Sequence, residues 1–449
     1  MTTTIGVPKD VYNRLARGLG ATAFGPVVTA VIQLGTVPLY LHAWGASRYG
    51  DWLLLFAIPS YFSLSNLGLG DASASDMSMR VSANDKDGAL ETFQSCWVLV
   101  TGICTLLLLI VTAFAWSIRW QHWLRLSSLN GSQAATIVLV LSAYVIVGQQ
   151  NSLTESGFRC DGNFALGTFW INVVRLMEAV LAATVAAFGG GLLAAAMAYL
   201  LVRTAGSIGY ACLLRHKSPW LELGVRHARL LRIRELVAPA LGFIAFPMAQ
   251  SLCVQGFTIL VGVALGPLAV VSFSTLRTLT RFNFQVLNVI GVGVWPELSS
   301  AFGAGKLALA RTLHRHAVRA ALVLSMVCGL ALSAAGPYIY RIWIHGSVQF
   351  DAPCFYVLLL VTLANSTWYV SSVVPMAANS HHRMAFLYLA LTLASLCCAW
   401  SLVHRYGTLG AALALLLIDL GMLWVVLRAA LDQLQDTTAD FARAIFLCT

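Results

Sequence analysis

Twelve apolar segments, each about as long as a membrane-spanning helix, constrain the fold of this chain more than any other feature. They cover residues 19–41, 50–70, 95–116, 134–154, 164–189, 191–214, 236–262, 267–295, 318–341, 354–377, 384–403 and 407–428. A hydrocarbon core about 30 Å thick requires about 20 residues of helix. Because lipid offers no hydrogen-bond partner to the backbone, each segment must satisfy its own polar groups as a helix. The sequence predicts an all-α polytopic membrane protein with about 12 transmembrane helices.

The composition and the charge agree with this class. Hydrophobic residues make up 59% of the chain and charged residues 10%, whereas a soluble domain has about 25% charged residues. The formal net charge of +10 suits basic loops that face an anionic lipid surface. The predicted partners therefore include membrane lipids and exclude nucleic acid.

The distribution of basic residues predicts the orientation. With the N-terminus in the cytoplasm, 19 of the 28 lysine and arginine residues lie on the cytoplasmic side and 5 on the other side. Since cytoplasmic loops of membrane proteins are enriched in lysine and arginine, both termini are expected in the cytoplasm. The first 18 residues run directly into the first apolar segment, so no cleaved signal peptide is expected.

The chain divides into two parallel-repeat six-helix bundles. The predicted parts are an N-terminal lobe (1–214), a basic inter-lobe linker (215–235), a C-terminal lobe (236–430) and a cytoplasmic tail (431–449). A faint internal repeat aligns Gln33 with Gln255 and Gly45 with Gly266. Both copies start on the same side, which predicts parallel repeats. The linker has two interpretations, an amphipathic helix in the headgroup layer and a solvated basic loop.

A polar stripe follows the span 267–295. It consists of Ser274, Arg277, Arg281, Gln285 and Asn288, whose spacings of 3, 4, 4 and 3 place them on one face of a helix. Each arginine near the middle of a span costs roughly 2.5 to 3.5 kcal/mol. A polar stripe inside the bilayer must face protein or water, so this helix is expected to line a cavity.

Two explanations compete for the two arginines of the stripe. One is a structural ion pair with acids on other helices, and the other is a site for an anionic ligand such as phosphate. The only acids deep within spans are Glu178 and Asp419, and Glu178 lies three residues from Arg175, which predicts a local pair. Arg203 then lacks a local partner and becomes a further cavity candidate. Asp419 has two possible roles, partner of Arg203 or proton or cation site. The buried excess of positive charge favours an anionic substrate.

Neutral polar residues at helical spacing provide weaker candidates. Gln33 and Gln255 lie in the two repeat-related helices, with threonine or serine one turn away, and Asn365, Tyr369 and Ser372 follow one face of span 354–377. Such residues are commonly interhelical hydrogen bonds. In a shared cavity, their donors and acceptors would suit sugar hydroxyl groups.

The motif search predicts a chain that is not an enzyme. HExxH, GxSxG and GxxxxGK[ST] are missing from the sequence, and the ten cysteines form no CxxC or Cys/His spacing. No catalytic residue, cofactor, metal or disulfide is therefore predicted. Coupling to the membrane potential, to protons or to sodium stays open, with Asp419 and Glu178 as candidate ion-coupling residues.

The N-terminal third carries motifs of a known family. They are Pro38–Tyr40 (PLY), the GASRYG stretch from Gly45 to Gly50, and the turn at Leu67–Leu69 (LGL). The chain resembles the polysaccharide transporter (oligosaccharide flippase) family of the multidrug/oligosaccharidyl-lipid/polysaccharide exporter superfamily. The resemblance implies a V-shaped pair of bundles around a central cavity in a bacterial inner membrane.

The same resemblance implies a function. A flippase of this family translocates an undecaprenyl-diphosphate-linked oligosaccharide, such as an O-antigen, capsule or exopolysaccharide unit, from the cytoplasmic to the periplasmic leaflet by alternating access. Its partners would be the lipid-linked anionic oligosaccharide and other polysaccharide-assembly proteins, and Arg277 and Arg281 would hold the diphosphate. The alternatives are a drug/cation antiporter of the same superfamily and a polytopic polysaccharide polymerase or ligase. The arginine excess argues against the first, and the short external loops against the second.

Overall fold

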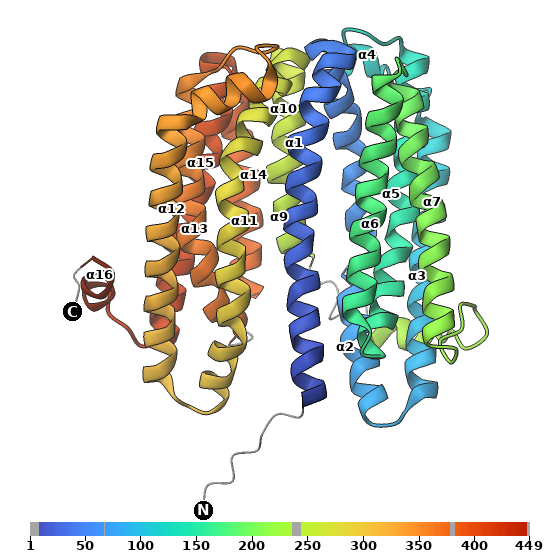
Figure 1. Cartoon of the computed structure of the whole chain (residues 1–449), viewed down its shortest axis with the longest axis vertical. Helices are drawn as coiled ribbons and strands as arrows, with labels where there is room; N and C mark the ends of the chain where they lie inside the picture. The colour runs from blue at the N-terminus through green and yellow to red at the C-terminus, as the bar shows by residue number, and fades with distance from the viewer. Residues whose placement is uncertain (1–8, 67, 236–243, 378–381, 447–449) are drawn as a thin grey trace, which may run out of the picture. The chain divides into compact units, whose positions relative to one another are not determined.

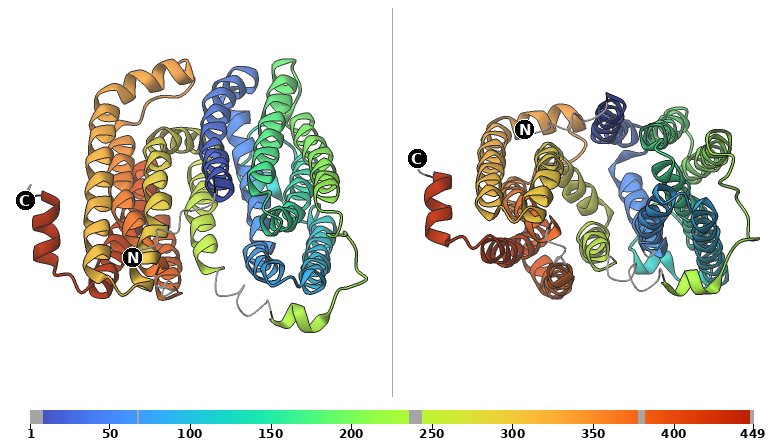
Figure 2. Two further views of the ribbon diagram at one scale, coloured as in Figure 1. Left: turned by 60° about the horizontal axis from the view of Figure 1, so that its bottom comes forward. Right: turned by 90° about the horizontal axis from the view of Figure 1, so that it is seen from below.

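The computed structural model describes residues 9–66, 68–235, 244–377 and 382–446, and the described part consists of helices and connections without strands (Figures 1 and 2). Ten segments of it are long and apolar enough to span a bilayer. One of them, Phe24–Ser65, contains most of each of the first two predicted spans, and helix α11 (Pro267–Gly303) contains a further one. The predicted all-α polytopic fold is confirmed.

The chain forms two compact units. The first comprises residues up to Trp44, Ile58–His122 and Ser128–Ile244, and the second comprises Gly45–Ala57, Trp123–Ser127 and the chain from Ala245 onward. The helices up to the inter-lobe connection are α1 (Lys9–Ser60), the 3₁₀ turn η1 (Tyr61–Asn66), α2 (Leu69–Ser82), α3 (Lys86–Phe114), α4 (Trp120–Trp123), α5 (Gly131–Cys160), α6 (Phe164–Ala187) and α7 (Leu192–Lys217). α5 packs against α2, α3, α6 and α7, so it is the central helix of the first unit.

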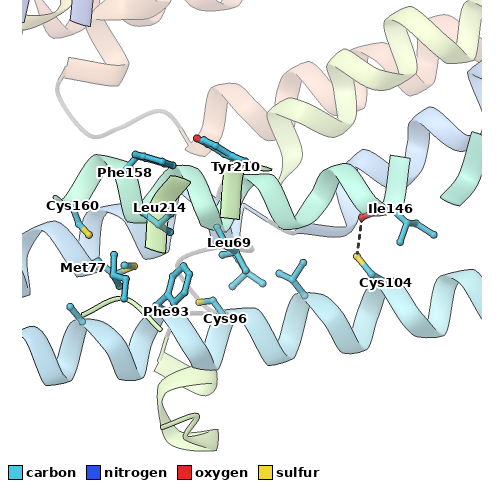
Figure 3. Close-up of a cluster of buried hydrophobic side chains, with 14 residues drawn as sticks. Leu69, Met77, Phe93, Cys96, Cys104, Ile146, Phe158, Cys160, Tyr210 and Leu214 are labelled. Carbon is cyan, nitrogen blue, oxygen red and sulfur yellow. Dashed lines mark hydrogen bonds between the residues drawn. The ribbon is translucent and has the colours of Figure 1, made fainter. Parts of the chain in front are cut away.

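Apolar side chains from α2, α3, α5 and α7 form a buried core in the first unit (Figure 3). Phe93 and Met77 are fully buried there. Phe158 stacks on Tyr210 with ring centroids 4.9 Å apart. The cluster holds the four helices together by close packing.

The inter-lobe linker is docked on the first unit. The Gln94 side-chain NH₂ donates to the Glu222 carbonyl (3.0 Å), and its oxygen accepts from the His227 backbone N–H (2.7 Å). Leu221 is 1% exposed within the core, and Arg229 pairs with Glu91 at 2.9 Å. The linker therefore belongs to the folded surface of this unit, because α3 supplies a glutamine that satisfies its backbone.

The second unit contains the remaining helices, of which α11 to α15 run side by side (Figure 1). They are α9 (Ala245–Ser251), the π-helical turn η2 (Leu252–Gly256), α10 (Phe257–Leu265), α11, α12 (Leu307–Ile344), α13 (Ala352–Ala377), α14 (His382–Tyr406), α15 (Thr408–Gln433) and α16 (Thr438–Phe446). α13 is the central helix, in contact with α11, α12 and α15. The amphipathic α16 buries Phe441 and Ile445 against α12.

Two glycines aligned by the internal repeat share a rare backbone conformation. Gly45 bends α1 with φ 74° and ψ 166°, and Gly266 joins α10 to α11 with φ 89° and ψ 176°. This region is accessible essentially only to glycine. The shared geometry explains why glycine stands at both places and supports the sequence repeat.

Candidate functional site

A cavity of about 270 Å³ lies inside the second unit. Its walls come from α9, η2, α11, α13, α14 and α15, and it is lined by Phe246, Gln250, Cys253, Val254, Arg277, Thr280, Arg281, Phe284, Leu358, Val361, Thr362, Asn365, Trp368, Tyr369, Tyr388, Leu415 and Asp419. The expectation that the arginine-bearing helix lines a cavity agrees with this geometry for Arg277 and Arg281. We call this cavity the C-lobe cavity.

Arg277 links α11 to the π-helical turn η2. Its Nη1 donates to the carbonyl oxygens of Val254 (3.1 Å) and Cys253 (3.4 Å), and its Nη2 donates to Thr258 Oγ1 (3.1 Å). A π-helical turn disrupts the regular i→i−4 ladder, so its carbonyl oxygens can accept an outside donor. These acceptors are neutral, so they satisfy hydrogen bonds of the guanidinium without cancelling its charge.

Arg281, one turn further along α11, has a different environment. In residues 9–66, 68–235, 244–377 and 382–446, no hydrogen bond or ion pair reaches its guanidinium from a described side chain or backbone group. The guanidinium carbon lies 5.9 Å from the ring centroid of Phe284 in a cation–π contact. A guanidinium with five donors facing a cavity in this way is suited to a carboxylate or a phosphate.

Asp419 supplies the acid of the C-lobe cavity. It is 7% exposed, and its Oδ1 accepts from Asn365 Nδ2 (2.7 Å) and from Trp368 Nε1 (2.7 Å). Two neutral donors therefore hold this carboxylate, and it forms no salt bridge with Arg281 among the described contacts. With both arginines and the acid ionised, the charged side chains of the cavity sum to +1.

Aromatic side chains complete the wall. Trp368 and Tyr388 lie 5.5 Å apart between ring centroids, Phe284 meets Tyr369 edge-on at 4.8 Å, and Tyr388 donates to Gln250 Oε1 at 3.0 Å. Aromatic faces beside a few polar groups are typical of cavities that bind amphipathic organic ligands.

The other predicted residues of the second unit differ in their relation to this wall. Ser274 and Gln255 do not line the C-lobe cavity, although Gln255 is part of η2. The side chains of Gln285 and Asn288 lie outside the described residues. Asn365 and Tyr369, which the sequence analysis placed below the arginines, are in the cavity wall. The substrate-binding roles of all these residues stay predictions.

The first unit contains a buried ion pair that corrects the predicted partners. Arg203 Nε donates to Glu178 Oε1 (2.5 Å), and Arg203 Nη2 donates to Glu178 Oε2 (2.7 Å) and to the Tyr144 hydroxyl (2.6 Å). Glu178 is 1% exposed. The predicted pair of Glu178 with Arg175 is wrong, because Arg175 instead contacts Thr29 Oγ1 at 3.2 Å. Arg203, for which the sequence offered no local partner, pairs with Glu178 on the neighbouring helix α6.

The proposed pairing of Asp419 with Arg203 is also wrong, since each side chain has other partners. The hollow beside Arg203 encloses about 10 Å³, which is about the space of one water molecule. Gln33 lies on α1 outside the walls of that hollow. Roles of Arg203 and Gln33 in substrate binding, and of Glu178 in ion coupling, stay predictions.

The two polar clusters occupy equivalent places in the two units. Arg203 and Asp419 each lie eleven residues after the first residue of α7 and α15. Their partners Tyr144 and Asn365 each lie thirteen residues after the start of α5 and α13. The sequence analysis missed this match. A comparison of the fourth and sixth spans of each half would have found it.

Comparisons with known proteins give the fold but no family. No protein-family model matches the chain, and no curated relative matches it. A solved structure described as the inward-facing conformation of a multidrug resistance MATE family transporter of the MOP superfamily is similar, with 15% identity, a TM-score of 0.75, and coverage of 94% of this chain and 100% of the other. The outward-facing conformation of such a transporter has 15% identity, a TM-score of 0.67 and coverage of 94% and 95%.

A further similar structure is a MOP superfamily transporter from Pyrococcus furiosus, described with a binding pocket of reverse polarity that suggests a different function. It has 15% identity, a TM-score of 0.66 and coverage of 94% of this chain and 96% of the other. The chain therefore has the fold of MATE transporters of the MOP superfamily.

Proposed function

We propose that the chain is an alternating-access transporter of the multidrug type, and that its substrates are amphipathic molecules with an anionic group bound in the C-lobe cavity. The solved structures that share the fold are described as multidrug transporters. They favour the drug-antiporter alternative of the sequence analysis over the oligosaccharide flippase. The observation that carries the anionic preference is Arg281, which faces the cavity without a described hydrogen-bond or ion-pair partner.

The size and the lining of the cavity support a small amphipathic ligand. Its volume of about 270 Å³ is near the lower end of the range for small-molecule pockets, roughly 300 to 1,000 Å³. Trp368, Tyr369 and Tyr388 offer aromatic faces for an apolar body. Arg281 would donate hydrogen bonds to the anionic group of the ligand, and Arg277 would add positive charge from one turn away. Outward movement of an anion gains about 2.3 kcal/mol per charge at 100 mV, inside negative.

Asp419 is the candidate for ion coupling in this proposal. Its Oδ1 is held by two donors, and the carboxylate faces the same cavity as Arg281. Protons or sodium ions on this carboxylate would change the net charge that a substrate meets. Asp419→Asn is expected to remove the dependence of transport on the ion gradient while leaving the protein folded. Unaltered gradient dependence in this variant would place the coupling elsewhere.

A lipid-linked oligosaccharide diphosphate is the second candidate substrate. The excess of arginine over acid in the cavity favours it, because guanidinium groups bind phosphate oxygens bidentately. Only the diphosphate would fit the cavity, so the sugars and the lipid would have to lie outside it. A bacterial inner membrane location, cytoplasmic termini and other polysaccharide-assembly proteins as partners belong to this candidate and remain proposals.

Transport by proteoliposomes that contain the purified chain tests both candidates. Three fluorescent substrates are compared: an amphipathic anion, its analogue with a quaternary amine in place of the acid, and a lipid-linked oligosaccharide diphosphate. The proposal expects gradient-dependent transport of the anion at least tenfold faster than of the cation. Transport of the lipid-linked substrate alone would establish the flippase. Transport of the cation alone would contradict the anionic preference.

A further inference from the structure

A second cavity lies along α15, apart from the C-lobe cavity. It is a groove of about 720 Å³ along the C-terminal half of α15, closed at one end by the connection Asp436–Thr438 that leads to α16. Figure 2 shows α16 at the end of this connection. The groove lies within the second unit, and its walls contain none of the residues of the C-lobe cavity.

The groove is apolar along its length. Leu420, Leu423 and Leu427 line it, and Leu420 is 48% exposed. Eight residues of helix separate Leu420 from Arg428, or about 12 Å at 1.5 Å per residue. This length is comparable to the depth of one leaflet of a hydrocarbon core about 30 Å thick. The apolar floor of the groove is therefore long enough to contact much of an acyl chain.

The end of the groove carries one cation and one anion. Arg428 lies over the ring of Trp424 at 5.7 Å, and Trp424 is 68% exposed, as expected for an aromatic anchor at the membrane interface. Asp432 follows Arg428 by one turn and also lines the groove. Asp436 is already paired with Arg315, at 2.5 and 2.8 Å, so it adds no free charge.

Arg428 and Asp432 form no ion pair with each other or with another described residue. A basic residue one turn before an acid is the less favourable order for a helical pair. Their opposite charges therefore face the groove one turn apart.

We propose that this groove binds a zwitterionic phospholipid with a primary amine, of the phosphoethanolamine class. The phosphate accepts hydrogen bonds from Arg428, the ammonium group donates to Asp432, and an acyl chain lies on Leu420, Leu423 and Leu427. A choline headgroup has no N–H to donate to the carboxylate. A glycerol headgroup places a net negative charge beside Asp432. The charge pattern therefore selects the amine headgroup among phospholipids that share a phosphate.

Native mass spectrometry of the full chain in detergent tests the proposal. Phosphatidylethanolamine, phosphatidylglycerol and phosphatidylcholine with identical acyl chains are titrated separately. We expect roughly tenfold stronger retention of phosphatidylethanolamine than of phosphatidylcholine, since a hydrogen bond to a charged group contributes roughly that factor. Arg428→Gln should lower the retention of phosphatidylethanolamine and of phosphatidylcholine. Arg428→Lys should restore part of that retention. Asp432→Asn should shift the preference toward phosphatidylglycerol.

The matched control is Arg405→Gln. Arg405 lies over the ring of Tyr406 at 5.4 Å at the end of α14. Like Arg428, it is an exposed arginine in contact with an aromatic ring, but it does not line the groove. This variant should bind the three lipids as the wild type does. Equal retention of all lipids by wild type and variants would overturn the proposal. A dimer that Arg428→Gln dissociates would also overturn it, because the groove would then belong to a contact between two copies.

Discussion

Replacement of Glu178 by glutamine tests the role of the buried pair in the first unit. The pair comprises two charge-assisted hydrogen bonds from Arg203, at 2.5 and 2.7 Å, and the acid is 1% exposed. Glutamine keeps the shape of the side chain but leaves the guanidinium charged and uncompensated. Loss of one partner of a buried pair costs roughly 3 to 5 kcal/mol. The Tyr144 hydroxyl at 2.6 Å remains as a neutral acceptor, so we expect the lower part of this range.

Thermal unfolding measured with a thiol-reactive fluorogenic dye reports this loss. Cys96, Cys104 and Cys160 are buried in the first unit. The exposed Cys212 and the cysteines of the second unit are first replaced by serine, so that labelling reports the first unit alone. A destabilisation of 3 kcal/mol should lower the Tm of this unit by about 6 to 12 °C, at 2 to 4 °C per kcal/mol for a domain of this size.

The matched control is Glu155→Gln, which removes a partly exposed pair with Arg159 at 3.0 Å. Exposed pairs contribute roughly 0 to 1 kcal/mol, so its Tm should change little. The double variant Glu178→Leu, Arg203→Met should recover most of the stability, because apolar residues of similar volume can replace a buried pair. A Tm for Glu178→Gln equal to that of the control would refute the reasoning.

Three further predictions concern the backbone and the linker. Gly266→Ala should destabilise the second unit by roughly 1 to 3 kcal/mol, since φ 89° strains any other residue; an unchanged Tm would contradict this. Gln94→Ala should make the linker at least severalfold more sensitive to limited trypsin cleavage at Arg226, because two backbone hydrogen bonds are lost; equal cleavage rates would contradict this. The Gly88 N–H, with Arg80, lowers the pKa of Asp85, so this helix cap should stabilise the fold above about pH 4 and be lost as pH falls through the lowered pKa. The measurement is the protection factor of the Gly88 amide, which is its exchange rate relative to an unstructured peptide at the same pH; a protection factor that does not fall in acid would contradict this.

The sequence was sufficient for the fold because long apolar segments have few alternatives in a bilayer. The polar stripe on α11 also placed Arg277 and Arg281 on one cavity-facing side, since helical spacing alone determines which residues share a face. The repeat of Gly45 and Gly266 was detectable for a similar reason, because glycine is the residue that tolerates their backbone angles.

The partners of buried charges could not be predicted from the sequence. Spacing along one helix favoured Arg175 as the partner of Glu178, but the packing of α6 on α7 brings Arg203 to the carboxylate instead. Similarly, the π-helical turn that accepts the hydrogen bonds of Arg277 has no sequence signature that we recognised. Contacts between helices depend on how each helix is rotated about its axis and shifted along its neighbour. Hydrophobic periodicity constrains both only coarsely.

The central claim, that the C-lobe cavity selects an anionic group through Arg281, is tested most directly by equilibrium binding. An amphipathic anion and its charge-inverted analogue are titrated into purified wild type and Arg281→Gln, with Arg281→Lys as the charge-preserving variant. We expect the wild type to bind the anion at least tenfold more tightly than the cation, and Arg281→Gln to lose most of this preference, because a charge-assisted hydrogen bond contributes roughly 1.5 to 3 kcal/mol. The account would be contradicted if the wild type preferred the cation and Arg281→Gln bound the cation still more tightly. Asp419 would then be the residue that determines the charge preference of the cavity.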